Sequence, residues 1–266
     1  MRNFVKGMSA FAAVVLTAGV LLLAVGWAMG GRPGVSLQWN GGHPALTQNE
    51  QHGAGRAAAA SAGTQTLEPG SAFTALALDV SGAQVDIGTG DKAGLAVSGT
   101  DAYTSEVKNG TWTIASDDHT FSDTVRFTVT LPAGTQLDSA QLRIGAGVLT
   151  AQGLSCGTAA LSVGAGTMTL TDFACTGDAA LEVGMGTLDV TGTLGGSTAV
   201  DCGMGKASLH AARPAAFGYA VDCGLGSVAV DGRRYSGVSK DVSVNAGAAV
   251  FFDIRCGMGA VTVDFT

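Results

Sequence analysis

The chain has 266 residues, of which 46% are apolar and only 13% charged, with 41 Gly and 5 Pro. This composition is too apolar for a disordered protein, and the glycines do not follow the strict triplet of collagen. The formal net charge is −7. An acidic chain lacks the basic face that binds phosphates, so no nucleic-acid partner is expected.

The N-terminus combines two cations with a long apolar run. Arg2 and Lys6 precede an apolar stretch over residues 10–29, which as a helix would span roughly 30 Å, the thickness of a bilayer core. We interpret residues 1–31 as a cytoplasmic tip and a transmembrane signal-anchor, with the rest of the chain outside the cytoplasm. A cleaved signal peptide is the alternative, although its apolar region is usually shorter. The expected location is therefore the cell membrane, in a single-pass arrangement.

Residues 32–66 are rich in Gly, Ala and polar residues and show no sustained period. This composition is typical of a flexible linker. The membrane helix and this linker would together tether the remainder, residues 67–266, outside the membrane.

Short alternating apolar and polar runs begin near Phe73. The segments "FTALALDV" and "AQVDIGTG" are examples, and a period of two is typical of half-buried strands. The pair Asn109-Gly110 favours a hairpin turn. An all-β fold is predicted.

A repeat follows, in which each unit reads strand, Gly-x-Gly, strand. The first glycines of the motif are residues 145, 164, 184, 203, 224 and 257, so that four near-equal steps of about 20 residues precede a longer one. This period predicts a parallel β-solenoid, similar to a β-helix, with about 20 residues per coil and neighbouring strands about 4.8 Å apart. The longer step predicts an inserted loop or hairpin around residues 233–250 before a closing coil.

Within the unit "LEVGMGTLDV", the apolar positions include Val183, Met185 and Leu188, and we expect them to face the core. The repeated glycines lack the third glycine and the following helix of a nucleotide-binding loop. We interpret them as corners at which glycine adopts a positive φ or fits a crowded turn.

The five cysteines follow the repeat rather than a metal-binding spacing. Cys202, Cys223 and Cys256 each come directly before a corner glycine, and Cys156 and Cys175 are one period apart. No C-x-x-C is present. Buried free thiols that replace valine are the favoured interpretation. Disulfides between stacked coils and a metal site are the alternatives, but the histidines do not cluster with the cysteines, and neither a metal nor a cofactor is expected.

An outward column of carboxylates is the candidate binding feature. Glu182, Asp201 and Asp222 occupy equivalent positions of their units, and we expect them on three successive coils. They form either a solvated edge or a weak site for a cation or a cationic polymer. No catalytic motif is present, so no enzyme activity is expected; a polysaccharide-acting β-helix enzyme and a structural spacer remain as alternatives.

Residues 73–265 resemble a bacterial family of envelope proteins known as "putative adhesins" with β-strand repeats. The resemblance lies in "FTALALDVSGAQVDI", "NGTWTI", "VRFTVTLPAGTQLDSAQLRIGAGVL", the Gly-x-Gly coils and the closing "IRCGMGAVTVDF". It implies an extracytoplasmic, non-catalytic module that is adhesin-like or accessory to the cell envelope, with an envelope or surface partner. The family brings no catalytic residues to this chain.

Overall fold

The alternating runs form strands in a computed structural model of the chain. The structure describes residues 35–40, 43–48, 65–67, 69–70, 72–116, 124–237 and 240–266. The chain divides into two compact units, residues 1–58 and 59–266. In the first unit, β1 (Val35–Asn40) pairs antiparallel with β2 (His43–Gln48). This hairpin lies within the range predicted as a linker, and its backbone pairing was not apparent from the sequence.

The predicted membrane-spanning segment, residues 10–29, lies outside the described residues. Among the residues that the structure does describe, no helix has the length and apolar character needed to cross a bilayer.

The second unit consists of strands, and its described part contains no helix, which confirms the all-β prediction. The strands are β3 (Gln65–Leu67), β4 (Ala75–Val80), β5 (Ala83–Gly90), β6 (Gly94–Ser98), β7 (Tyr103–Lys108), β8 (Thr111–Ser116), β9 (Arg126–Pro132), β10 (Gln136–Ile144), β11 (Gly147–Gln152), β12 (Ser155–Val163), β13 (Thr167–Cys175), β14 (Ala179–Val183), β15 (Thr187–Leu194), β16 (Ser197–Cys202), β17 (Lys206–Ala211), β18 (Phe217–Cys223), β19 (Ser227–Val230), β20 (Arg233–Ser236), β21 (Lys240–Val244), β22 (Val250–Cys256) and β23 (Ala260–Phe265).

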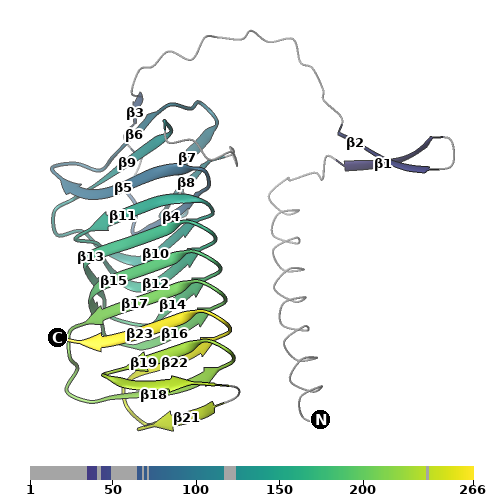
Figure 1. Ribbon diagram of the computed structural model, residues 1–266. Helices are drawn as coiled ribbons and strands as arrows, with labels where there is room; N and C mark the ends of the chain where they lie inside the picture. Colours follow the sequence, from purple (N-terminus) through teal and green to yellow (C-terminus); the bar gives the residue numbers. More distant parts are fainter. Residues whose placement is uncertain are drawn as a thin grey trace. The chain divides into compact units, whose positions relative to one another are not determined.

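These strands stack in two parallel ladders (Figure 1). The first ladder runs in the order β8, β4, β10, β12, β14, β16, β22, β18. The second runs β9, β5, β11, β13, β15, β17, β23, β19. In the repeat, each Gly-x-Gly joins a strand of the first ladder to a strand of the second. We call each such pair of strands, with its Gly-x-Gly, a coil; one coil thus contributes one strand to each ladder.

The core lies between the two ladders and is built from in-register columns. Leu161, Leu181 and Val200 are register partners on successive strands, and all are buried. Leu154, between β11 and β12, and Phe173, near the end of β13, are buried as well. A single coil would leave its apolar face exposed to water. Stacking against the next coil buries this face, and each large apolar side chain that is buried stabilises the fold by about 1.5–3 kcal/mol.

At the C-terminal end, the order of the coils differs from the order of the sequence. The closing strands β22 and β23 lie between β16/β17 and β18/β19. The inserted segment supplies β20 and β21, which pair antiparallel with β19 and β18. The insertion predicted from the long step is confirmed, but the closing coil is an inner one.

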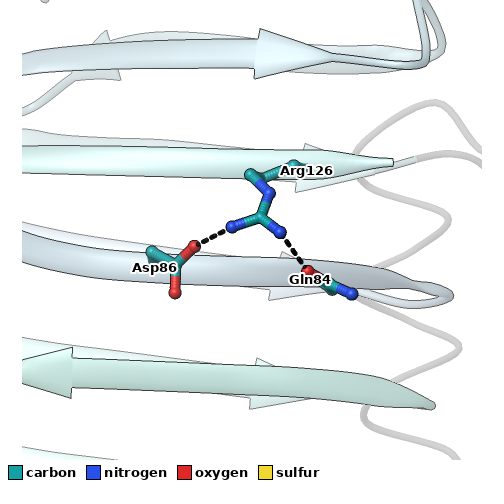
Figure 2. A network of polar contacts seen from close by, with 3 residues as sticks. All are labelled: Gln84, Asp86 and Arg126. Carbon is teal, nitrogen blue, oxygen red and sulfur yellow. Dashed lines mark hydrogen bonds and ion pairs between the residues drawn. The ribbon is translucent and has the colours of Figure 1, made fainter. Parts of the chain in front are cut away.

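At the N-terminal end, too, the order of the strands in the stack differs from their order in the sequence. Strands β8 and β9 lie outside β4 and β5, and β7 and β6 pair antiparallel with β8 and β9. Arg126 on β9 reaches across to β5, where its Nη1 lies 3.0 Å from Asp86 Oδ2 and its Nη2 donates to Gln84 Oε1 (Figure 2). At both ends, antiparallel strands therefore pair with the outermost strands of the parallel stack.

The corner glycines are required by crowding more than by φ. Among the six Gly-x-Gly motifs only Gly147 has a positive φ, so of the two interpretations of the corners, crowding applies to the others, Gly203 included. A Cβ on Gly203 would lie 3.1 Å from Gly184 O, whereas one on Gly205 would overlap Gly186 O and lie 2.7 Å from Val183 Cγ1. The second glycine is therefore the tighter position, because the carbonyl of the coil beside it occupies the space of a side chain.

Candidate functional site

The outward face of the first ladder combines small and charged side chains. Because successive residues of a strand point to opposite faces, every second residue of this ladder is directed away from the core. Two outward columns result. A floor column runs Ala77, Gln141, Ala160, Ala180, Ala199, Asp253, and a charged column runs Asp79, Arg143, Ser162, Glu182, Asp201, Arg255, Asp222.

Two adjoining hollows follow the floor column. One, of about 290 Å³, lies over β4, β10, β12 and β14 and is bordered by Asp79, Arg143 and Glu182. The other, of about 490 Å³, lies over β12, β14, β16 and β22 and is bordered by Asp178 and Phe251. Ala180 lines both. We call these two hollows together the outer trough. The short alanine side chains form its floor, and the longer side chains beside them form its walls.

The structure changes the predicted carboxylate column. Glu182 and Asp201 are register partners on β14 and β16, as expected. Asp222 does not follow Asp201, because β22 lies between their strands and places Arg255 between the two carboxylates. The expectation of three successive carboxylates is wrong for this reason. Stacked carboxylates repel each other, and the inserted guanidinium relieves part of that repulsion.

Arg255 lies close to two carboxylates on this face. Its Nη2 donates to Asp253 Oδ2 over 2.7 Å, and its Nη1 lies 3.8 Å from Asp201 Oδ1. Burial nevertheless raises the pKa of Asp201; Arg255 opposes this shift and Asp253 adds to it. The Asp201 carboxylate of the charged column is thus partly desolvated.

The cysteines form two inward columns, as the repeat predicted. Cys202, Cys256 and Cys223 are successive register partners, and Cys156 is the partner of Cys175. All five are buried free thiols in this structure.

Burial raises the pKa of Cys202 and raises that of Cys256 to about 11, where Cys202 and Cys223 add to the shift. The hydrogen bond with Cys156 lowers the pKa of Cys175 to about 7, against the effect of burial.

No group of three His, Cys, Asp or Glu side chains within the described ranges is arranged to hold a metal ion. The ordering of the thiols by the repeat accounts for their spacing without a ligand.

Sequence reasoning missed the outer trough and the position of Arg255 in the charged column. The alanine at the equivalent outward position of several units was a signal in the sequence that this face is hollowed. Only the strand order, however, shows that Arg255 and Asp253 continue the two columns.

Met185 does not face the core, so the prediction of a buried side chain there is wrong. Met185 is 65% exposed, and the equivalent corner residues Met204, Met258 and Leu225 are exposed at 56%, 60% and 71%. The alternation of the strand does not continue through Gly-x-Gly, because the chain bends there and directs the middle residue outward.

No family model and no curated protein matches this chain. Among solved structures, it is similar to a "putative cell adhesion protein" from Clostridium sporogenes, with a TM-score of 0.45 and 16% identity, over 77% of this chain and 98% of that one. A "putative adhesin" from Bacteroides fragilis gives a TM-score of 0.43 and 15% identity, over 75% and 95%. A "putative lipid binding protein" from Parabacteroides distasonis gives 0.37 and 12%, over 76% and 96%. These structural neighbours thus include bacterial proteins described as adhesins or as a cell adhesion protein, all at low sequence identity.

Proposed function

We propose that residues 67–266 form a β-solenoid that serves as a non-catalytic binding module of the cell envelope. The module is adhesin-like, and its partner is an extended segment of an envelope or surface protein that lies in the outer trough. The observation that carries the proposal is the continuity of the two hollows across β4, β10, β12, β14, β16 and β22. A partner that runs along the stack would contact one coil after another.

The chemistry of the trough favours a protein partner over a sugar polymer. Its floor is mostly alanine, interrupted by Gln141 and Asp253, and its walls carry both signs of charge, for example through Arg143 and Glu182. Sugar-binding grooves typically stack sugars on aromatic rings. Among the residues that line the two hollows, Phe251 is the single aromatic one, and it lines the larger hollow. Mixed charge beside a low apolar floor suits the backbone and small side chains of an extended peptide.

The sequence supports the proposed location. The apolar run over residues 10–29, with Arg2 and Lys6 before it, is the pattern of a signal-anchor that leaves the C-terminal part outside the cytoplasm. We propose on this basis that the module is attached to the membrane by a single span.

Site-specific photocrosslinking in native cells tests the binding surface. A photoreactive residue at Ala180, on the trough floor, should give a discrete protein adduct, and the same probe at Thr150, exposed on β11 of the other ladder, should not. Filling the floor with Ala160→Trp should abolish the adduct formed from position 180. Identical adducts from both positions, or an adduct that persists when the floor is filled, would refute the outer trough as the binding surface.

A further inference from the structure

The corner residues of four neighbouring coils form an exposed column that contains sulfur. In stack order these residues are Met185, Met204, Met258 and Leu225. The backbone N–H of each one donates to a glycine carbonyl of the coil beside it over 2.8 Å. The four corners therefore have equivalent hydrogen bonding, and their side chains leave the stack at the same place on successive coils. We call Met185, Met204 and Met258 the methionine ladder.

Exposure distinguishes the methionine ladder from a core feature. Its three side chains are 56–65% exposed, whereas Met168 on β13 is fully buried. Burial is the ordinary use of methionine, and no described side chain covers these three to that degree. Their thioether sulfurs are thus open to solvent and to small ions.

The spacing of the ladder matches the geometry of a soft metal ion. Parallel strands lie about 4.8 Å apart, so neighbouring corners have this separation. With the zinc–sulfur bond of about 2.3 Å as a guide, two sulfurs on opposite sides of one ion lie about 4.6 Å apart. The spacing of adjacent corners therefore matches the separation of two sulfurs that hold one ion between them. Thioethers are soft ligands that select copper(I) over the harder divalent ions.

We propose that the methionine ladder is a binding site for a soft monovalent cation of the copper(I) type, with Met204 as the central ligand. Met204 has a methionine neighbour on each side, so it takes part in either adjacent pair. The buried cysteine column behind the corners does not compete, because its side chains are at most 3% exposed. The net charge of −7 favours the approach of a cation.

Silver(I), a redox-stable probe of the same class, tests the site in the full-length chain. The chain is labelled with ¹³C at the methionine methyl groups and titrated with silver nitrate in a chloride-free buffer. The methyl signals of Met185, Met204 and Met258 should shift in a saturable manner, and that of Met168 should not. The absence of a shift in the ladder signals would overturn the proposal.

Leucine substitutions separate the role of sulfur from that of apolar surface. Met204→Leu leaves Met185 and Met258 two coils apart, so affinity for silver(I) should fall at least about tenfold. Met185→Leu leaves an adjacent pair and should cost less. Leu225→Met in the Met204→Leu background places a new sulfur beside Met258 and should restore binding.

Thermal melts of each variant establish that the stack is intact. Unchanged silver(I) affinity in Met204→Leu would mean that thiols or another site bind the ion. A well-folded double variant that fails to regain binding would mean that adjacency of the sulfurs is not the determinant. Either result would overturn the proposal.

Discussion

Asp201 and Arg255 are register partners on neighbouring parallel strands, with Asp201 Oδ1 3.8 Å from Arg255 Nη1. Both side chains are about half exposed, so their attraction is worth less than about 1 kcal/mol. Its importance lies in where it occurs. The pair shows that the last coil of the sequence lies beside β16 in the stack. This position separates Asp201 from Asp222.

The raised pKa of Asp201 predicts a pH-dependent effect on stability. A carboxyl whose folded pKa lies above its ordinary value of 3.8 binds protons more tightly in the folded state, so stability falls as pH rises through that window. Asp201→Asn should therefore raise the free energy of unfolding at neutral pH by less than about 1 kcal/mol, and the gain should vanish below pH ~3.8. Urea denaturation at several pH values measures this difference.

Asp231 provides the opposite case. The hydrogen bond from Arg213 lowers the pKa of Asp231, so its contribution is present above the ordinary value and is lost as pH falls. Asp231→Asn should lower stability at neutral pH. The same sign of effect in both variants would contradict the assignment.

The two glycines of one corner should differ sharply in tolerance. Gly205→Ala places a Cβ against Gly186 O, the backbone of the neighbouring coil, and should cost about 3 kcal/mol or more. Gly203→Ala meets Gly184 O at 3.1 Å and should cost about 1 kcal/mol. Thermal melts compare the two, and equal losses would show that crowding by the adjacent carbonyl is not the cause.

Cys202→Val should be nearly silent. Cys202 is the register partner of Val183, and both side chains are buried. Val183 Cγ1 lies 2.7 Å from a Cβ built on Gly205, and Cys202 Sγ lies 2.8 Å from one built on Gly259, so the two side chains fill the same space on successive coils. The substitution should change the free energy of unfolding by less than about 1.5 kcal/mol. A larger loss would point to a specific role for the thiol.

Thr198→Val should stabilise the protein. The Thr198 hydroxyl is buried and has no hydrogen-bond partner among the described residues. Valine has a similar shape and removes the desolvated hydroxyl, so a gain of about 1 kcal/mol is expected in chemical denaturation.

Thr135→Val is the control for this measurement. The hydroxyl of Thr135 donates to Pro132 O over 2.7 Å, so its removal should reduce stability. Destabilisation by Thr198→Val would show that its hydroxyl is satisfied in solution, for example by water.

Much of the repeat could be predicted without coordinates. The step of about 20 residues and the alternation around Leu181 and Val183 indicated parallel stacking and an inward face. The inward cysteines followed from the same alternation. Met185 was misplaced because alternation describes extended chain, and Gly-x-Gly is a bend. The outer trough was missed because its floor and walls come from strands that are distant in the sequence.

The sequence by itself determined the period of the coils and which residues of each strand face the core, since both depend on local alternation and regular spacing. The order of the coils at the two ends was decided only by the tertiary structure. A strand such as β22 has the same apolar face toward either neighbour, and the 33-residue step before it is long enough to reach several positions. Its insertion beside β16 places Arg255 between Asp201 and Asp222, and Met258 between Met204 and Leu225.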